Sequence, residues 1–267
     1  MPELPEVEFA AGRLRQAVLG HTIDRAEALH PSQRRHLPPA AARALAGQRI
    51  ERVDRRAKVQ LIHLTDGSVL EVHFRLNGDW EFTTLDEPPP RHERVRLTTR
   101  EGVRVSLVDS RALCVLTRHA PGTFAGVEAG PEPLADTFTA EVLRAALRTR
   151  RAPIKPVLLD QHVVAGVGNI YASEALWEAR IHPATPANTL SAARVARLRD
   201  AIVEVLRTAP TGRYWERTTA DGTPVRESEI WRVYGRTGDP CRRCGSAVRD
   251  VLQAGRRSYW CARCQRR

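Results

Sequence analysis

The sequence lacks any long apolar run, and it contains little lysine, methionine or aromatic residue. No stretch of its 267 residues approaches the roughly 18 consecutive apolar residues that a membrane-spanning helix needs. The first eight residues, MPELPEVE, have neither the basic start nor the apolar run of a secretion signal. We therefore expect a soluble protein with no membrane partner.

Lysine is nearly absent although the chain is strongly basic. Lys58 and Lys155 are the two lysines among 42 basic residues, which outnumber 31 acidic residues and give a net charge of +11. This charge favours a polyanionic partner such as nucleic acid, although a solvated arginine-rich surface would have the same charge. An arginine replaces a lysine poorly where a compact charge or a titratable amine is needed. The two lysines are therefore candidate functional residues.

Short strand-like runs dominate the first half of the chain, after one amphipathic helical pattern over residues 6–20. The runs are β-branched or alternate between apolar and polar residues, and Gly, Pro and Asp turns separate them. They cover residues 21–29, 49–65, 68–84, 94–110 and 112–118. Strands at such regular spacing predict an antiparallel β-sandwich or barrel on which the helix packs.

The second half of the chain is predicted to be helical. A segment rich in Pro and Gly over residues 129–136 separates it from the strands. Beyond it, apolar residues recur at spacings of three and four in residues 139–149, 154–164, 169–179 and 191–209. The chain is thus predicted to have an α+β fold. Its expected parts are a β-sandwich domain over 1–130, a linker over 131–137, a helical domain over 138–230 and a terminal hairpin over 231–267.

Four of the five cysteines form a regular array near the end of the chain. Cys241, Cys244, Cys261 and Cys264 follow a CxxC-x16-CxxC pattern. Two such pairs let four thiolates reach one tetrahedral zinc ion, because the strand-like segment between them returns the second pair to the metal. One structural zinc ion is predicted, with disulfides or a redox CxxC as the alternatives. Cys114 is expected to be a buried strand residue.

Separated pieces of the chain carry a family resemblance. They are MPELPEVE at the start, IKPVLLDQHVVAGVGNIYASEALWEARIHP in the middle, and VYGRTGDPCRRCG with CARCQ at the end. Together with GPEPLAD and RRAKVQL, they make the chain resemble the formamidopyrimidine-DNA glycosylase and endonuclease VIII family of base-excision repair enzymes, nearer the first branch. The resemblance spans the full length. It implies a bacterial, cytoplasmic, nucleoid-associated monomer that binds damaged double-stranded DNA.

The resemblance assigns the chemistry to the N-terminus and one lysine. It implies a bifunctional DNA glycosylase and AP lyase that excises 8-oxoguanine and formamidopyrimidines and cleaves the strand by β,δ-elimination. If Met1 is removed, Pro2 presents a secondary α-amine, and α-amines titrate near about 7.7–8.0, so much of it is a free nucleophile at neutral pH. Glu3 is implied to be the general acid and base, and Glu6 to orient groups or handle protons. Lys58 is implied to contact the phosphate beside the lesion and to assist the chemistry.

The same resemblance implies residues that hold the DNA backbone. Gly166, Gly168 and Asn169 lie in the turn of a helix-two-turn-helix, where glycines allow close approach of a phosphate and the asparagine offers donors at a helix start. In the zinc hairpin, Arg256 is implied to grip the phosphates that flank the lesion. Arg257 is the alternative if the hairpin register shifts by one residue.

Two residues have a structural alternative beside the implied function. His73 is implied to contact the DNA backbone, and a hydrogen-bonded core histidine is the alternative. Lys155 falls in the family motif IKP, where we expect a structural part. The sequence leaves both alternatives open.

The void-filling positions depart from the formamidopyrimidine-DNA glycosylase pattern. Those enzymes fill the gap left by an extruded nucleotide with Met, Arg and Phe, and the matching residues here are Leu76, Arg111 and Leu113. A leucine wedges between bases but has no aromatic face for stacking. Leu76 matches endonuclease VIII more closely, because that enzyme inserts a leucine at this position. Residues 217–228 match the lesion-covering loop, and they show no recognisable specificity for oxidised guanine. The alternatives are an endonuclease VIII-like enzyme for oxidised pyrimidines and a non-catalytic, zinc-containing damaged-DNA-binding protein.

Overall fold

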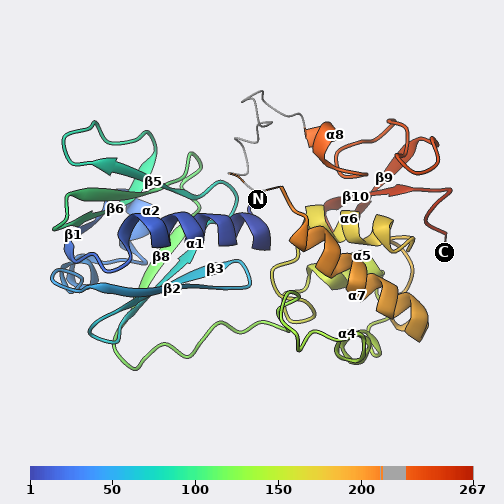
Figure 1. The fold of residues 1–267 in the computed structure, drawn as a ribbon, viewed down its shortest axis with the longest axis horizontal. Coiled ribbons are helices and arrows are strands. Elements are labelled where there is room, and N and C mark those ends of the chain that lie inside the picture. The colour runs from blue at the N-terminus through green and yellow to red at the C-terminus, as the bar shows by residue number, and fades with distance from the viewer. Residues whose placement is uncertain (211, 213–226, 267) are drawn as a thin grey trace. The chain divides into compact units, whose positions relative to one another are not determined.

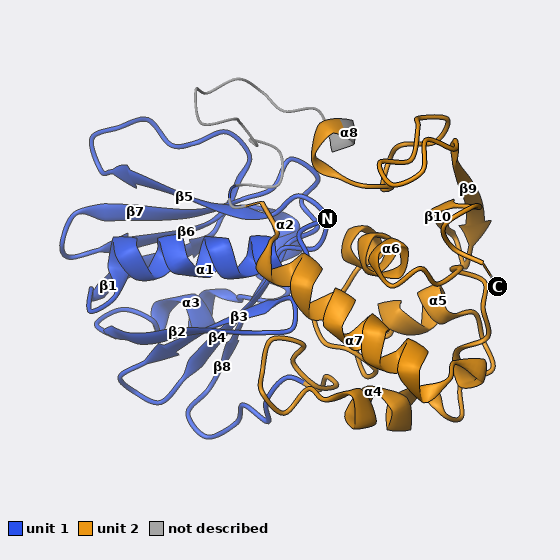
Figure 2. Ribbon diagram, turned by 45° about the vertical axis from the view of Figure 1, so that its right-hand side comes forward, with its two compact units in different colours: residues 1–127, 212–214 blue, residues 128–211, 215–267 orange. Residues whose placement is uncertain are grey.

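The computed structural model describes residues 1–210, 212 and 227–266, and it divides the chain into two compact units. The first unit begins at Met1 and runs through Val127, and the second begins at Glu128 (Figure 2). Across the described residues, no helix combines the length and the apolar character needed to cross a membrane. The predicted lesion-covering segment, residues 217–228, lies almost entirely outside the described part. Strands dominate the first unit and helices the second, which confirms the α+β prediction.

Two four-stranded sheets and one long helix, α1 (Leu4–Val18), form the first unit (Figure 1). One sheet has the strand order β1 (Ile23–Ala28), β6 (Glu93–Thr99), β7 (Val103–Val108) and β5 (Asp79–Thr84). The other has the order β2 (Ile50–Arg56), β3 (Val59–Leu64), β4 (Val69–His73) and β8 (Val115–His119). Every pairing within these sheets is antiparallel, as the sequence predicts for a sandwich.

Helix α1 packs against an edge strand of each sheet. It contacts β2 in one sheet and β5 in the other. Its buried apolar residues that join the core of both sheets are Val7, Ala10, Ala11, Leu14 and Val18. In the same core, Trp80 Nε1 donates to Gln60 Oε1 at 2.6 Å, and Gln60 Nε2 donates to the carbonyl of Val7 at 3.0 Å. These bonds fix α1 against β3 and β5.

Three local features differ from the sequence prediction. Helices α2 (Pro31–Arg34) and α3 (Pro39–Arg43) lie between β1 and β2, and they escape prediction because four or five residues are too few for a helical period. Helix α5 ends at Leu159 instead of near residue 164, because Asp160 has an extended ψ of 114°. Cys114 is buried, but it precedes β8 instead of lying within a strand.

The second unit is built around helix α6 (Asn169–Glu178). Residues 170–177 of α6 are all buried, as expected for a helix covered on every side. It contacts α5 (Ile154–Leu159), α7 (Ala192–Arg207) and β10 (Arg256–Cys261). The remaining elements are α4 (Ala140–Leu147), the 3-10 helix η1 (Ala187–Thr189), α8 (Glu227–Ile230) and β9 (Val248–Gln253).

A two-residue turn joins β9 to β10. Ala254 and Gly255 both have positive φ, 47° and 73°, which matches a type I′ turn whose twist suits a pair of strands. The register pairs Arg256 with Gln253 beside the turn and Cys261 with Val248 at the other end. The hairpin therefore carries Arg256 at its tip and a predicted zinc ligand at its base.

Candidate functional site

A capping box fixes the residues that are predicted to carry the chemistry. Glu3 is the N-cap of α1 and is 1% exposed. Its N–H donates to Glu6 Oε2 at 2.9 Å, and the N–H of Glu6 faces the Glu3 side chain in return. Pro2 is buried directly before this cap, and its nitrogen becomes a secondary amine only when Met1 is removed. Glu6 therefore orients the backbone of Glu3, whose carboxyl group lies at the positive end of the α1 dipole.

Lys58 lies in the tight turn between β2 and β3 and is 7% exposed. The turn residue before it, Ala57, has a positive φ of 53°. Arg55 spans from this turn to α1, because its Nη1 donates to the Ala57 carbonyl at 3.0 Å and its Nε donates to Glu8 Oε2 at 3.0 Å. The lysine is thus presented by a turn that is tied to the helix carrying Glu3.

His73 ends β4 and pairs with Val59, the neighbour of Lys58, in the sheet register. Burial, together with the charges of Arg75 and Lys58, lowers the pKa of His73 to about 4. The N–H of Arg75 donates to His73 Nδ1 at 2.9 Å, so the proton of the neutral ring lies on Nε2. The imidazole is therefore a neutral donor at pH 7.

The three predicted void-filling residues lie on two adjoining turns of the first unit. Leu76 is partly buried in the turn after β4, while Arg111 and Leu113 are exposed in the loop between β7 and β8. Asn77 Nδ2 donates to Ser110 Oγ at 3.2 Å, which joins the two turns. The structure thus brings these three predicted residues onto neighbouring segments.

Gln161, which the sequence did not indicate as a functional residue, stabilises the turn between α5 and α6. Gln161 Nε2 donates to the carbonyls of Leu159 and Val167 at 3.0 and 2.9 Å, and its Oε1 accepts from the N–H of Gly166 at 2.9 Å. Gly166 has a φ of 79°, a conformation that favours glycine. Gly168 is the N-cap of α6. Both glycines are buried.

Lys155 holds Asn169, the first residue of α6. Lys155 is 1% exposed, and its ammonium donates to Asn169 Oδ1 at 2.7 Å and to the carbonyl of Arg257 at 2.6 Å. An ammonium only donates hydrogen bonds, so the amide oxygen of Asn169 faces Lys155. The amide nitrogen of Asn169 is left to act as a donor. One buried charge therefore orients this side chain and ties the turn to the hairpin.

The four predicted metal ligands come together as a set. The sulfur atoms of Cys241, Cys244, Cys261 and Cys264 all lie within 4.8 Å of one another. The Cys241–Cys264 and Cys244–Cys261 sulfur separations are 4.0 and 3.4 Å. A tetrahedron with Zn–S bonds of about 2.3 Å has edges of about 3.8 Å, so the spacing fits one zinc ion. Four sulfur ligands close the coordination sphere, which makes the site structural.

Helix α6 supports this zinc site through Trp177. The indole Nε1 donates to Cys241 Sγ at 3.4 Å. The guanidinium of Arg243, which lies inside the first CxxC pair, stacks over the indole ring at 3.9 Å from the centroid. Arg243 Nη1 also donates to the Trp177 carbonyl at 3.0 Å. The first cysteine pair is thus docked on α6.

Glu174 is a second support that the sequence analysis missed. Its carboxylate accepts from the backbone N–H groups of Arg232, Val233 and Tyr234 at 2.8–2.9 Å. Burial raises the pKa of Glu174, while these three donors favour the ionised form. Its signal in the sequence is a carboxylate between the apolar residues Ala172, Ala175 and Leu176. The segment that leads into the hairpin is therefore held at its backbone by α6.

The structure distinguishes the two arginines at the hairpin tip. Arg257 forms an ion pair with Asp250 on the opposite strand. Arg256 is exposed, and among the described residues it has no side-chain hydrogen-bond or ion-pair partner. Arg256 is the arginine whose charge is left for an external anion.

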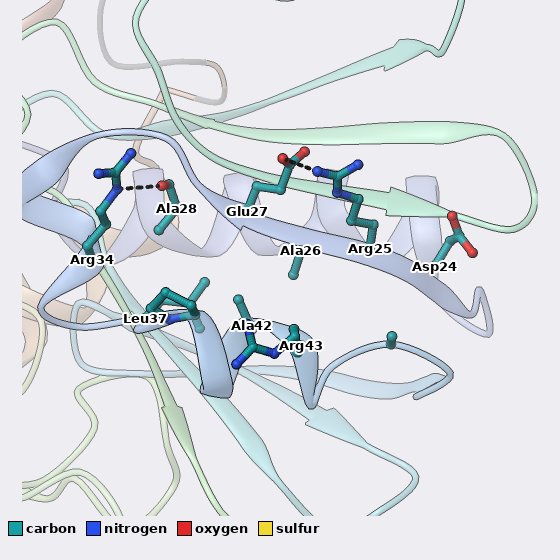
Figure 3. A pocket seen from close by; sticks show the side chains of 11 residues that line it. Asp24, Arg25, Ala26, Glu27, Ala28, Arg34, Leu37, Ala42 and Arg43 are labelled. Atoms are coloured by element: carbon teal, nitrogen blue, oxygen red, sulfur yellow. Dashed lines mark hydrogen bonds and ion pairs between the residues drawn. The ribbon is translucent and has the colours of Figure 1, made fainter.

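A pocket of about 330 Å³ lies elsewhere in the first unit, between β1 and α3 (Figure 3). Arg25 and Glu27 in its wall pair with each other at 2.8 Å, and Arg34 Nε donates to the Ala28 carbonyl at 3.5 Å. None of the predicted site residues lines it. The pocket therefore plays no part in the site described above.

These features define a class of protein that combines an antiparallel sandwich, a helix-two-turn-helix and a cysteine-rich zinc hairpin. Three family models match successive parts of the chain. The formamidopyrimidine-DNA glycosylase N-terminal domain matches residues 1–116, the formamidopyrimidine-DNA glycosylase H2TH domain matches residues 129–214, and a zinc finger found in FPG and IleRS matches residues 238–267. The chain belongs to the formamidopyrimidine-DNA glycosylase family.

Full-length relatives agree with this assignment. Proteins named formamidopyrimidine-DNA glycosylase from Chloroflexus aurantiacus and Chloroflexus aggregans are 39% and 42% identical, over 99% of this chain and 98% of each relative. A Lactococcus lactis FPG mutant in complex with Fapy-dG DNA is 32% identical over the whole of both chains, with a TM-score of 0.90. MutM bound to DNA containing carbocyclic 8-oxo-G is 31% identical, again over both whole chains, with a TM-score of 0.88.

Proposed function

We propose that this chain is a bifunctional DNA glycosylase and AP lyase that excises 8-oxoguanine and formamidopyrimidines from duplex DNA. The observation that carries the proposal is the capping box, which keeps a buried Glu3 carboxyl group directly behind Pro2. Family membership supports the same reaction, because solved relatives hold Fapy-dG DNA and abasic-site DNA. The partner is damaged double-stranded DNA.

Pro2 is the proposed nucleophile once Met1 has been removed. Its neutral amine attacks the anomeric carbon of the damaged nucleotide, and the glycosidic bond breaks with its electron pair leaving on the base. Loss of the N–H proton and opening of the sugar ring then give an iminium between the proline nitrogen and that carbon. Glu3 protonates the ring oxygen as the ring opens, and a proton returns to a carboxylate during elimination. The iminium acidifies the neighbouring sugar proton, which allows successive loss of both flanking phosphates.

Four further predicted residues hold the DNA backbone. Lys58 supplies a positive charge to the phosphate beside the lesion, and His73 supplies a neutral N–H donor, since its pKa is lowered to about 4. Asn169 offers its amide nitrogen, because its oxygen already accepts from Lys155. Arg256 offers an exposed guanidinium fork, which has no partner among the described residues and suits a phosphate. We also propose that the protein acts as a monomer, in the cytoplasm, at the nucleoid.

An endonuclease VIII-like activity on oxidised pyrimidines is the second candidate. Leu76 and Leu113 favour it, because they replace the usual methionine and phenylalanine at void-filling positions. A DNA-binding protein that does not cut would have no use for a capped, buried Glu3 behind Pro2. The capping box therefore favours an enzyme in either case.

Product analysis on matched duplexes tests the proposal. The Met1-processed protein is incubated with duplexes that contain 8-oxoguanine, a formamidopyrimidine or an oxidised pyrimidine. We expect release of the two purine-derived lesions and a one-nucleotide gap with phosphate at both ends. Faster excision of the oxidised pyrimidine would favour the second candidate, and salt-sensitive binding without any strand cleavage would contradict both enzymatic readings.

A further inference from the structure

One buried carboxylate organises the loop between β7 and β8. Asp109 is 1% exposed, and it accepts three backbone hydrogen bonds from its own loop. Oδ1 accepts from the N–H of Arg111 at 2.9 Å, and Oδ2 accepts from the N–H groups of Leu113 and Cys114, both at 2.7 Å. Most N–H groups between Asp109 and the start of β8 are therefore bonded to a single side chain.

Side chains from outside the loop bind its carbonyl groups. Arg94 Nε, from β6, donates to the carbonyl of Asp109 at 2.6 Å. Two residues of α2 reach the other end of the loop. Ser32 Oγ donates to the Ala112 carbonyl at 3.2 Å, and Gln33 Nε2 donates to the Cys114 carbonyl. The loop backbone is thus fixed on both its donor and its acceptor groups.

This fixed backbone presents two exposed side chains. Leu113 is 43% exposed, and Arg111 is exposed beside it. Ala112, between them, has a positive φ of 55°, a conformation that is unfavourable for a non-glycine residue. Ordering a loop residue costs backbone entropy, so these bonds stabilise a conformation that places an apolar side chain in water. Burial of Leu113 in the unit's own core does not explain the arrangement.

We propose that Asp109 is a positioning residue that holds the loop ready for Arg111 and Leu113 to enter the space left by an extruded nucleotide. The proposal rests on the proposed glycosylase function. A loop already ordered in the free protein does not lose conformational entropy when its side chains enter DNA. Asp109 should therefore affect steps that need base extrusion from a duplex, and it should not affect the chemistry at Pro2.

Asp109→Asn is the direct test, and Asp66→Asn is its matched control. Asp66 also caps a turn of the first unit, with Oδ1 accepting from the N–H of Ser68 at 2.9 Å and Oδ2 paired with Arg118 at 2.9 Å. The Asp109 change replaces one carboxylate oxygen with an NH2 group, which donates hydrogen bonds and cannot accept from a loop N–H group. Single-turnover excision is measured on a duplex lesion, and strand cleavage is measured at an abasic site in single-stranded DNA, where no helix has to be filled.

We expect Asp109→Asn to slow duplex excision by about 10- to 100-fold and to leave single-strand cleavage within about twofold. Asp66→Asn should change neither rate. In a double-mutant cycle, Leu113→Ala should slow duplex excision in the wild-type background and add little in the Asp109→Asn background. Equal losses on both substrates, an unchanged duplex rate, or additive effects in the cycle would overturn the positioning role.

A milder variant keeps the test decisive if Asp109→Asn does not fold. Ser32→Ala removes one donor to the loop from the outside, and we expect a loss of about three- to tenfold on the duplex substrate alone. A Ser32→Ala protein that matches the wild type on both substrates would count against the proposal. A wild-type protein that cleaves neither substrate would instead contradict the proposed function, which separates the two failures.

Discussion

The two units hold their functional residues by different means. In the first unit, a core shared by α1 and both sheets supports turns whose N–H groups bond to single carboxylates, Glu6 and Asp109. In the second unit, the hairpin has a small apolar cluster around its cysteines and is held by thiolates, Lys155 and Glu174. Small modules bury little apolar surface and commonly need metal ligands or buried polar bonds for stability. Loss of one such interaction should disorder a single turn in the first unit, whereas in the second unit it should detach the hairpin from the helices.

Removal of zinc should have the largest effect and separate the two units. Structural zinc contributes about 10–16 kcal/mol of apparent free energy in small zinc domains, so a chelator should unfold the hairpin and abolish tight DNA binding. Limited proteolysis should then cut after residue 230 while residues 1–127 stay resistant. Cys261→Ser should lose the metal, and Cys114→Ser should retain one zinc per chain. A chelated protein with a protease-resistant hairpin would show that the metal is dispensable.

Glu3→Gln should have the next largest effect, and it should act on catalysis without affecting the fold. Loss of the general acid should slow base excision by about 10²- to 10⁴-fold, while the amide retains an oxygen for the capping box. The matched control is Glu141→Gln, which changes another glutamate in the first turn of a helix. Single-turnover rates and thermal midpoints are compared. An equal loss of excision rate in both variants would contradict the role of Glu3 as the general acid.

His73 should make the stability of the first unit depend on pH. Its pKa is about 4 in the folded protein and 6.5 in the absence of the fold. Between these values the unfolded chain binds the proton and the folded chain does not. The free energy of unfolding should therefore fall as the pH drops from 6.5 to 4, by at most about 3 kcal/mol. Above pH 6.5 the ring is neutral in both states, so His73 causes no loss of stability there.

His73→Gln should flatten this dependence, and His162→Gln, at an exposed position of the second unit, should not. Thermal midpoints recorded from pH 4 to 7.5 compare the three proteins. If the wild type and His73→Gln lose stability in parallel over this range, then other groups dominate the acid response.

The smallest expected effect distinguishes the two hairpin arginines. Arg256→Gln should reduce the slope of log K against log salt for duplex binding by about 0.9, the value for one lost phosphate contact. Arg257→Gln should change the slope less, because Asp250 already pairs with its guanidinium. Binding is measured from 50 to 300 mM salt. A larger change for Arg257 would place the phosphate contact one residue further along β10.

The sequence predicts the fold class because each unit follows a local period. Alternating residues identify the strands of the sandwich, and spacings of three and four identify α4, α6 and α7. The zinc site is also readable, because its ligand spacing reflects one tetrahedral ion. Helices as short as α2 are not readable. Pro31 starts α2 and His30 caps it, but four residues do not complete a pattern.

The residues that support the site could not be found in the same way. Lys155 acts on the carbonyl of Arg257, 102 residues away, and Glu174 acts on the N–H of Arg232, 58 residues away. The partners in these bonds are backbone groups, which do not depend on the residue type. The sequence therefore does not indicate which residue accepts or donates the bond. Asp109 bonds within its own loop, yet a single aspartate before a turn is too common to indicate a positioning role.

Covalent trapping tests the role of the N-terminal amine most directly. The Met1-processed protein is mixed with an abasic duplex and borohydride, which reduces an iminium to a stable amine, and the linked peptide is sequenced by mass spectrometry. We predict that the DNA is attached to Pro2. Pro2→Gly replaces the secondary α-amine with a primary α-amine, and it should form the adduct more slowly at the same position. Attachment to Lys58, or no adduct on a duplex that is tightly bound, would contradict the mechanism proposed here.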